Sequence, residues 1–445
     1  MVRDVLREGV FFALQEPEYV ANPYPLYHRL RSESPFYWDF VSCAWFLTRY
    51  ADVRAALADP RLTTKNFPFD VSQLSPDLQD HLAPLARVAN KEVLHNDASE
   101  HDRLRRPLNR AFNPAAFERL RPEMETVALE LLGRAERRRS IDVVRDYSEP
   151  LADHMIGELL GLPHADRAKF IKWCDQLRSF MMMRRISRET VLKAKGAVKS
   201  FEAVRAYIQT MIGARRDNFV DDVIGQSFAV GENEAPPTED EILANCVFFL
   251  HSGARNMSSS ITNAILVLLR HPEQFARLRE DPQSITIAVE ELLRYETPLQ
   301  LVTRGVPEEI EFAGRRMGPK HLLVLLLGAA NRDPEHFADP DRLDLTRRPN
   351  RHVSFGVGSH GCVGAWMARF GLATAIRAIL DRQTNLRLAP RKRQWNLPLL
   401  RRTVHALPVL VDRRLRTGQR PQLRMAGALS SKPTKFARTA IPCSQ

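Results

Sequence analysis

The residues with the clearest chemical potential lie in the stretch HVSFGVGSHGCVGA, which runs from His352 to Ala365. Its glycines allow tight turns and let the backbone approach a bulky group closely. A helical pattern follows at once, and a cysteine just before a helix N-terminus has its thiolate favoured by the helix dipole and by free N–H groups. The stretch therefore predicts a loop that can present one sulfur, that of Cys362, to a metal.

A second unusual stretch, FFLHSGARNMSSSI, runs from Phe248 to Ile261 in the middle of a long apolar helical pattern. Arg255 carries a permanent charge and is rarely buried without a partner. Its neighbour Asn256 can hold a water and donate a hydrogen bond but does not ionise. The residues alone leave two interpretations open for Arg255, namely pairing with a nearby acid and binding of an anionic substrate group.

The elements that must position these residues are mainly helical. Apolar residues recur at three- and four-residue spacing in 50–60, 117–138, 198–217, 242–272 and 285–296. Short strands are predicted at 44–49, 309–317, 321–327 and 405–411. We therefore expect a mainly α fold with small β-sheets.

Composition and length indicate an ordinary globular protein. The chain has 445 residues, of which 44% are hydrophobic and 27% charged. No linker divides it, so residues 1–412 are predicted to form one domain. Residues 413–445 are basic, contain proline and are poor in large apolar side chains, which predicts a disordered C-terminal tail.

The composition also excludes several classes of partner. The N-terminus resembles no signal peptide, and no run approaches the roughly 18–20 apolar residues that span a bilayer. We expect a cytoplasmic protein with no membrane contact. Five scattered cysteines without a CxxC pair disfavour zinc and disulfides. The net charge of +12 is spread along the chain without a nucleic-acid motif, which favours an acidic protein partner over nucleic acid.

The cysteine loop also carries a family resemblance. Phe355, Gly358, Cys362 and Gly364 follow the order F-x-x-G-x-x-x-C-x-G, which resembles the haem-binding loop of the cytochrome P-450 family. The resemblance covers roughly residues 15–412. It implies the P-450 fold, an α+β triangular prism with a long central helix over the haem. It also implies heme b (iron protoporphyrin IX) as cofactor, with Cys362 as the axial metal ligand and Phe355, Gly356 and Gly364 shaping its loop.

Other segments agree with this resemblance. The pair Glu291 and Arg294 matches the family's E-x-x-R motif and is expected to be structural. Four further residues match positions that hold the haem propionates, where donors are needed because an unpaired buried charge is costly: His101, Arg105, Arg304 and His352. The segment around Ala98 and Ser99 departs mildly, since bacterial members often have proline there.

The family comparison sharpens the question raised by the long helix. Most members carry an acid followed by an alcohol at the positions of Arg255 and Asn256, and this pair orders water and relays protons during oxygen activation. We expect Arg255, Asn256 and Ser252 to occupy the oxygen-activation site. Three outcomes stay open: monooxygenation with protons arriving through water held by Asn256 and by Ser252 or Ser258, a substrate whose acidic group binds Arg255, and oxidative C–C or C–N coupling of an aromatic or peptide-derived substrate without oxygen insertion.

The resemblance implies an oxidoreductase that oxidises a small organic molecule, in a tailoring step of natural-product biosynthesis. Electrons would come from a separate ferredoxin and ferredoxin reductase, with docking arginines at positions 103, 106, 110 and 369. The expected substrate pocket is lined by Phe180, Met182, Phe248, Phe249, Leu299, Leu301 and Leu399. The alternative of another class is a non-catalytic recruitment domain, which would have lost the cysteine and the propionate partners.

Overall fold

The architecture is organised around one long helix, α13 (Glu239–Arg270). Its start is fixed by a capping box, in which the Thr238 hydroxyl accepts from the Glu241 N–H while the Glu241 carboxylate accepts from the Thr238 N–H. Pro272 follows its end. The computed structural model describes residues 9–65, 71–72, 74–181, 188–229, 231, 234–382, 385–391, 393–396 and 400–412.

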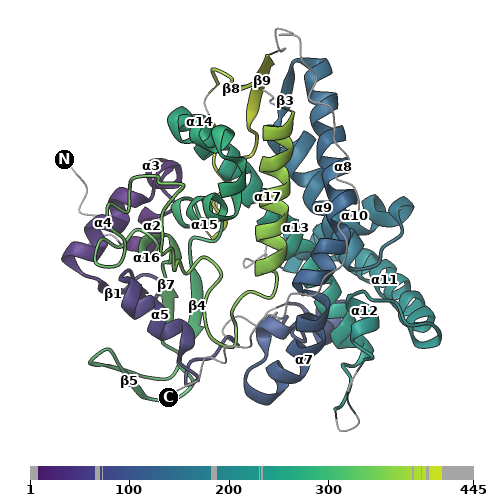
Figure 1. Cartoon of the computed structure of the whole chain (residues 1–445). Coiled ribbons are helices and arrows are strands. Elements are labelled where there is room, and N and C mark those ends of the chain that lie inside the picture. The colour runs from purple at the N-terminus through teal and green to yellow at the C-terminus, as the bar shows by residue number, and fades with distance from the viewer. Residues whose placement is uncertain are drawn as a thin grey trace, which may run out of the picture. The chain divides into compact units, whose positions relative to one another are not determined.

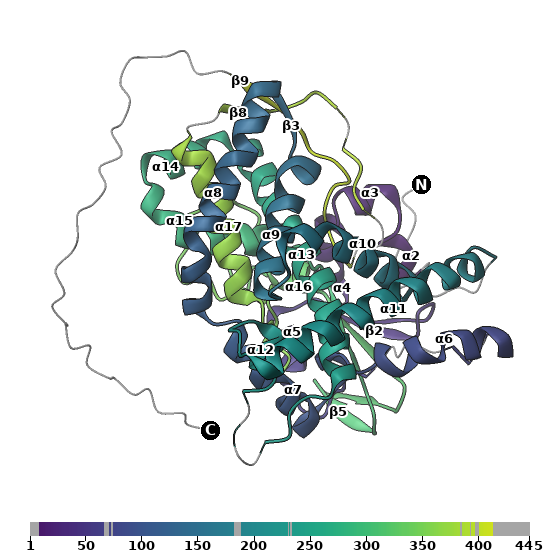
Figure 2. The same ribbon diagram turned by 90° about the vertical axis from the view of Figure 1, so that its right-hand side faces the viewer.

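The other large helices surround α13. Helices α9 (Glu149–Leu159), α10 (His164–Met181), α15 (Ile285–Tyr295) and α17 (Ala365–Asp381) contact it directly (Figure 1). Helix α8 (Pro114–Arg138) packs along α17, and α11 (Arg188–Asp217) packs along α10 on the side that faces the viewer in Figure 2. The remaining helical segments are α2 (Val10–Ala13), α3 (Pro17–Ala21), α4 (Tyr24–Glu33), α5 (Tyr50–Ala58), α6 (Pro76–Ala89), η1 (Val93–His95), α7 (Ala98–Ala111), η2 (Val144–Ser148), α12 (Val223–Gln226), α14 (Pro272–Glu280), η3 (Pro282–Ser284) and α16 (Leu327–Ala330).

The strands form small sheets. A four-stranded sheet has the order β1 (Phe36–Asp39), β2 (Ala44–Leu47), β7 (Leu322–Leu325) and β4 (Val302–Gly305), with only the β2–β7 pair parallel. A three-stranded sheet has the order β3 (Ser140–Asp142), β9 (Pro408–Asp412) and β8 (Asn385–Leu388). Strands β5 (Ile310–Phe312) and β6 (Arg315–Met317) form a hairpin. The four-stranded sheet lies beside α5 in Figure 1, across the molecule from α10 and α11.

These elements confirm the predicted fold class and every predicted helix, and they place strands in all four predicted segments. The prediction missed β1, β3, β4 and β8. Each of these strands has three or four residues. The correctly predicted β2, β5, β6 and β7 are equally short, so length alone does not explain which strands were missed.

A buried ion pair ties the helical part to the segment that leads to the cysteine loop. Arg294 donates to both carboxylate oxygens of Glu291, at 2.7 and 2.8 Å, and also to the carbonyls of Asn331 and Pro340. Glu291 is 0% and Arg294 1% exposed. Glu291 in turn accepts from the Asp344 N–H and from side chains of the same segment, as a buried charge requires. The pair therefore has the structural role that was predicted.

Two further expectations concern the chain as a whole. The described residues belong to one compact unit, Met1–Arg413, and the predicted tail at 413–445 lies outside the described residues. Within the described part of the chain, none of the helices combines the length and the apolar character needed to cross a membrane.

We expect Glu291→Ala to lower the free energy of unfolding by about 3–5 kcal/mol, because it leaves Arg294 buried without its counter-ion. Urea denaturation measures this change. Glu309→Ala is the control, because Glu309 forms an exposed pair with Arg316, and exposed pairs contribute little. Equal midpoints for the two variants would contradict the structural role of Glu291.

Candidate active site

The cysteine loop is a tight turn that ends on the first residue of α17. Gly356 and Gly358 both have left-handed backbone angles, with φ of 65° and 80°. A Cβ on Gly358 would lie 3.2 Å from the Leu57 carbonyl oxygen and from Ala58 Cα, so the loop packs against the end of α5 without room for a side chain. The Cys362 N–H donates to the Phe355 carbonyl at 2.8 Å, which closes the turn.

The surroundings of Cys362 act on its thiol in opposite directions. The side chain is exposed to solvent, yet the protein packed around it desolvates the sulfur and raises the pKa of the thiol. The Gly364 N–H and the charges of Arg105 and Arg369 lower that pKa. The net effect is a raised pKa, so the N–H donor and the two cations offset the desolvation of the sulfur only in part. Coordination to a metal would complete the deprotonation of this thiol.

Next to this loop lies a cluster of buried polar groups. His101 on α7 is 2% exposed and its ring lies 4.2 Å from that of His360. Burial, His101 and Arg304 lower the pKa of His360 to about 4, while Asp97 acts against them. His360 Nε2 lies 3.3 Å from Asp97 Oδ1. The cluster, formed by Asp97, His101, Arg304 and His360, thus holds three donor side chains close together.

His360 is the residue that sequence reasoning missed. It stands two residues before Cys362, so the same turn that presents the sulfur also presents this imidazole. Its place two residues before Cys362 was the feature of the sequence that could have identified it. His101 and Arg304, which were predicted as propionate partners, both lie in the cluster. The third, Arg105, donates to the Gly361 carbonyl at 2.6 Å, and burial lowers its pKa against the opposing effect of Cys362.

The structure does not bring His352 into this cluster. Its Nε2 lies 3.2 Å from Glu290 Oε2, in ion-pair range although not aligned as a hydrogen bond, and its Nδ1 accepts from the Ser354 N–H. Nδ1 is therefore hydrogen-bonded, while Nε2 lies beside the Glu290 carboxylate without a hydrogen bond. Burial raises the pKa of Glu290, but His352 and Arg369 outweigh it and hold the value at about 2. The structure thus places His360, and not His352, beside His101, and the propionate role of His352 stays a prediction.

Arg255 is engaged by three carboxylates on α9 and α10. Its guanidinium lies 3.1 Å from Asp175, 3.3 Å from Asp153 and 3.4 Å from Glu149. Burial works to lower the pKa of Arg255, and the three acids outweigh it and raise the value. Burial raises the pKa of Asp153 to about 6, against the effect of Arg255. Of the two open interpretations, the geometry favours pairing with acids over an anion-binding role.

The half-buried residues of α13 identify its accessible face. Phe248, Ser252 and Asn256 are spaced by four residues, so their side chains share one face of the helix, and all three are half-buried. His251 and Arg255 are also half-buried, but they lie toward Asp175 on α10. The described residues provide no hydrogen-bond partner for the Ser252 hydroxyl or the Asn256 amide. Ser258 contacts Ser148 instead, at 3.2 Å.

The other predicted pocket residues lie in the core or in the segment before β4, where the structure describes them. Phe249 is 4% exposed and packs on Phe112 with ring centroids 5.3 Å apart, and Phe180 on α10 is equally buried. Leu299 and Leu301 are half-buried before β4. Met182 and Leu399 lie outside the described residues.

The predicted docking arginines are already paired within the chain. Their partners are Glu100 and Glu241 for Arg103, Glu234 for Arg106, the Gln226 carbonyl for Arg110 and Glu290 for Arg369. Three of these arginines are therefore paired with carboxylates, whereas Arg110 donates to a neutral carbonyl.

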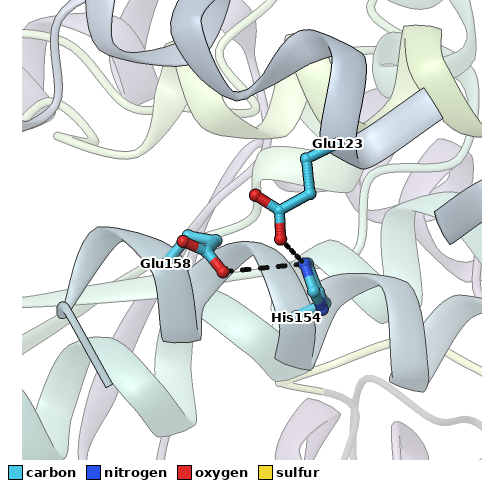
Figure 3. A group of neighbouring side chains, drawn as sticks. All are labelled: Glu123, His154 and Glu158. Carbon is cyan, nitrogen blue, oxygen red and sulfur yellow. Dashed lines mark hydrogen bonds and ion pairs between the residues drawn. The ribbon is translucent and has the colours of Figure 1, made fainter. Parts of the chain in front are cut away.

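A second cluster, shown in Figure 3, has residue types that could hold a metal: Glu123, His154 and Glu158. Arg167 Nη1 lies 3.2 Å from His154 Nδ1 and also pairs with Glu158. Because arginine only donates, Nδ1 must accept, so Nε2 carries the proton and donates to Glu123 Oε1 at 2.7 Å. A metal at Nε2 would have to displace that proton and leave Nδ1 facing a donor. We interpret the cluster as an ion-pair network that joins α8, α9 and α10.

The cysteine loop and the polar cluster fit a haem. Cys362 supplies one sulfur ligand, and a Cβ on Gly364 would lie 3.8 Å from that sulfur, so the loop is kept free of side chains beside it. Arg304, His101 and His360 supply donors for two carboxylates. The fold and this site together define the haem-thiolate enzymes.

Comparison with known proteins agrees, and the chain belongs to the cytochrome P-450 family. The family model described as cytochrome P-450 matches residues 85–287 and 285–396. The chain is 33% identical to the biotin biosynthesis cytochrome P-450 of Bacillus subtilis over 397 residues, 89% of this chain and 98% of the relative. It is 30% identical to PksS of Bacillus subtilis, described as a polyketide biosynthesis cytochrome P-450, over 91% of this chain and all of the relative.

A solved structure shows the same fold. P450BioI, crystallised in complex with acyl carrier protein ligated to hexadec-9Z-enoic acid, aligns with a TM-score of 0.78 and 33% identity over 88% of this chain and 99% of its own. The protein is therefore a haem-dependent oxidoreductase, a P-450 monooxygenase or oxidase, with heme b as its cofactor.

We expect Gly358→Ala to reduce haem incorporation and stability, because the new Cβ would contact the α5 backbone in a left-handed conformation. The ratio of Soret absorbance to protein absorbance measures incorporation. Gly318→Ala is the matched control, since no atom lies within 4 Å of its added Cβ and its φ is not left-handed. Full haem content in the Gly358 variant would overturn this account of the loop.

We expect Arg255→Met to lower the melting temperature, by more at about pH 7.5 than at about pH 5. The pKa of Asp153 is raised to about 6, so its protonated form contributes stability at low pH that is lost as the pH rises through this value. Without Arg255 the three acids repel one another more strongly as they ionise. Arg119→Met, which breaks an exposed pair with Asp221, should give a small shift that does not change with pH. A pH-independent loss for Arg255→Met would rule out this explanation.

Proposed function

We propose that this enzyme oxidises a small organic molecule in a tailoring step of natural-product biosynthesis. Support comes from the relatives, two of which are described by their roles in biotin and polyketide biosynthesis. The haem, when bound to Cys362, supplies an oxidant for unactivated C–H bonds. In this proposal Arg105, Arg304, His101 and His360 hold the propionates. A cytoplasmic location stays a prediction.

The observation that carries the proposed mechanism is the contrast between Arg255 and Asn256. Arg255 pairs with acids of α9 and α10, while Asn256 offers, on the accessible face, a half-buried amide for which the described residues provide no hydrogen-bond partner. An amide can hold a water through its oxygen and its NH₂ group, and the Ser252 hydroxyl one turn earlier can hold the same water or the next. Protons would then reach the reaction through this water, without an ionising side chain on α13.

Electrons are proposed to come from a ferredoxin and its reductase, as the family resemblance implies. Because the predicted docking arginines are paired internally, we expect docking to depend less on these four charges than their sequence positions suggested. The non-catalytic recruitment alternative predicts loss of the cysteine and of the propionate partners, and this chain keeps both.

Oxidative coupling remains the second candidate, because loss of the usual acid and alcohol weakens proton delivery for oxygen insertion. The mass of the product distinguishes the two reactions. The haem-loaded enzyme, ferredoxin, reductase and a panel of long-chain alcohols, amides and acids are incubated under labelled oxygen. Hydroxylation predicts a gain of one labelled oxygen atom. A loss of two hydrogens or the mass of a coupled product would contradict hydroxylation and indicate oxidative coupling. Absence of the thiolate-haem band in the reduced carbon monoxide spectrum would contradict the proposal that the protein is an enzyme.

Within the hydroxylation proposal, we expect Asn256→Ala to lower product formed per oxygen consumed by at least about tenfold, with the difference released as hydrogen peroxide, because the water that delivers protons is no longer held. Asn263→Ala is the matched control on the same helix. Its amide donates to the Arg402 carbonyl, so the change should lower stability and leave the coupling ratio intact. Unchanged coupling in Asn256→Ala would remove the proposed role.

A further inference from the structure

A group of unpartnered polar atoms is buried where η1, α10 and α13 meet. Arg178 Nη1 donates to Glu92 Oε1 at 2.5 Å, and His95 Nε2 lies 3.7 Å from the other oxygen, Oε2. Three buried atoms here have no hydrogen-bond partner: Glu92 Oε2, Arg178 Nε and His95 Nδ1. They are three of the ten such atoms found among the described residues, so the unmade bonds are concentrated at this site.

Leaving these bonds unmade is costly. Glu92 is 1% exposed, and the side chain of Arg178 is 11% exposed. A buried polar group without a partner costs on the order of 1–3 kcal/mol. Burial raises the pKa of Glu92 to about 7, with Arg178 acting against it, and burial with the charge of Arg178 lowers the pKa of His95. A partner that is absent from the free chain would complete the site.

The site borders the accessible face of α13. The guanidinium carbon of Arg178 lies 5.8 Å from the centroid of the Phe248 ring. Phe248 shares its face with Ser252 and Asn256 and precedes Asn256 by eight residues. At 1.5 Å per residue, the polar site therefore lies about 12 Å along the helix from Asn256.

The chemistry of the free atoms defines what fits. Ionised Glu92 Oε2 only accepts, and Arg178 Nε–H only donates. A matching group must therefore donate and accept at neighbouring positions, as a hydroxyl or a carboxamide does. Glu92 and Arg178 together carry no net charge. A carboxylate ligand would therefore be repelled by Glu92, and an ammonium ligand would be repelled by Arg178. The two histidines near the site add no positive charge to it. Burial lowers the pKa of His95, and it lowers the pKa of His251 despite the hydrogen bond of that ring to Asp175.

We propose that Glu92, Arg178 and His95 form a substrate-recognition site for a neutral hydroxyl or carboxamide on an otherwise apolar molecule. The proposal rests on the proposed oxidation at the haem face. It adds that the recognised group binds beside Phe248, about 12 Å along α13 from Asn256.

The test compares three ligands of similar length: 1-dodecanol, its isomer 1-methoxyundecane and dodecanoate. Their binding to the haem-loaded full chain at about pH 8 is measured by the Soret shift and, independently of the haem signal, by the rise in melting temperature. We expect the alcohol to bind at least about tenfold tighter than the ether, which cannot donate, and than the acid, which is charged. Equal affinities for alcohol and ether, or tighter binding of the acid, would overturn the proposal.

The variant for this test is the double change Glu92→Leu with Arg178→Met. It removes both charges together, because removing one alone would leave the other buried and unpaired and would destabilise the fold. We expect this double variant to bind the alcohol and the ether with about equal affinity, and to bind the ether as tightly as the unmodified protein does. The control is Asp221→Leu with Arg119→Met, which removes an exposed ion pair and should keep the preference.

Two outcomes separate this proposal from the proposed function. A preference that persists in the double variant assigns recognition to other residues and overturns the polar site, whatever the enzyme oxidises. A missing thiolate-haem band, with the melting-temperature preference intact and lost in the double variant, supports the polar site while removing the proposed oxidation.

Discussion

The buried pair of Glu291 and Arg294 is the interaction on which the position of the haem loop depends. Arg294 holds the carbonyls of Asn331 and Pro340, and Glu291 holds the Asp344 N–H. The chain from residue 331 to 350 is thereby fixed against α15. From there Asn331 Oδ1 accepts from the Val353 N–H at 2.8 Å, directly before the cysteine loop. A buried ion pair thus connects the helical core, through these hydrogen bonds, to the loop that holds Cys362. A displacement of the Cys362 sulfur by a fraction of an ångström would change the geometry of its bond to a metal.

The sequence predicted the parts of this arrangement that depend on local patterns. The long periodic helices, the glycine turn around Cys362 and the i, i+3 spacing of Glu291 and Arg294 are all local. It failed where position depends on packing between distant segments. His352 and His360 lie in the same short loop, and only the folded backbone directs one ring to Glu290 and the other to His101. The partners of Arg255 are a similar case, because Glu149, Asp153 and Asp175 come from two other helices and no spacing rule connects them to α13.

The unpartnered atoms near Glu92 could not be predicted for the same reason. Glu92 precedes a short 3-10 turn, Arg178 lies near the end of α10, and the sequence gives each the appearance of an ordinary surface residue. Their burial comes from the way η1 and α10 close over Phe248 on α13. Polar atoms that are buried without partners are visible only in a structure, and they point to a ligand because a folded chain otherwise pairs such groups.

Arg255 and its three acids reverse the sign of the charge that the family resemblance places on α13. The family resemblance places an acid on α13 at this position, whereas here the cation stands on α13 and the carboxylates stand on α9 and α10. These ion pairs join α13 to both helices. What changes is the chemistry of the accessible face, which has Ser252 and Asn256 near the centre of the helix and no ionising group at the usual position. Neither side chain can release a proton near neutral pH. In the proposed mechanism the protons are carried by water whose order depends on these two neutral groups. The position of the substrate, which determines where that water can remain, is then part of the proton supply.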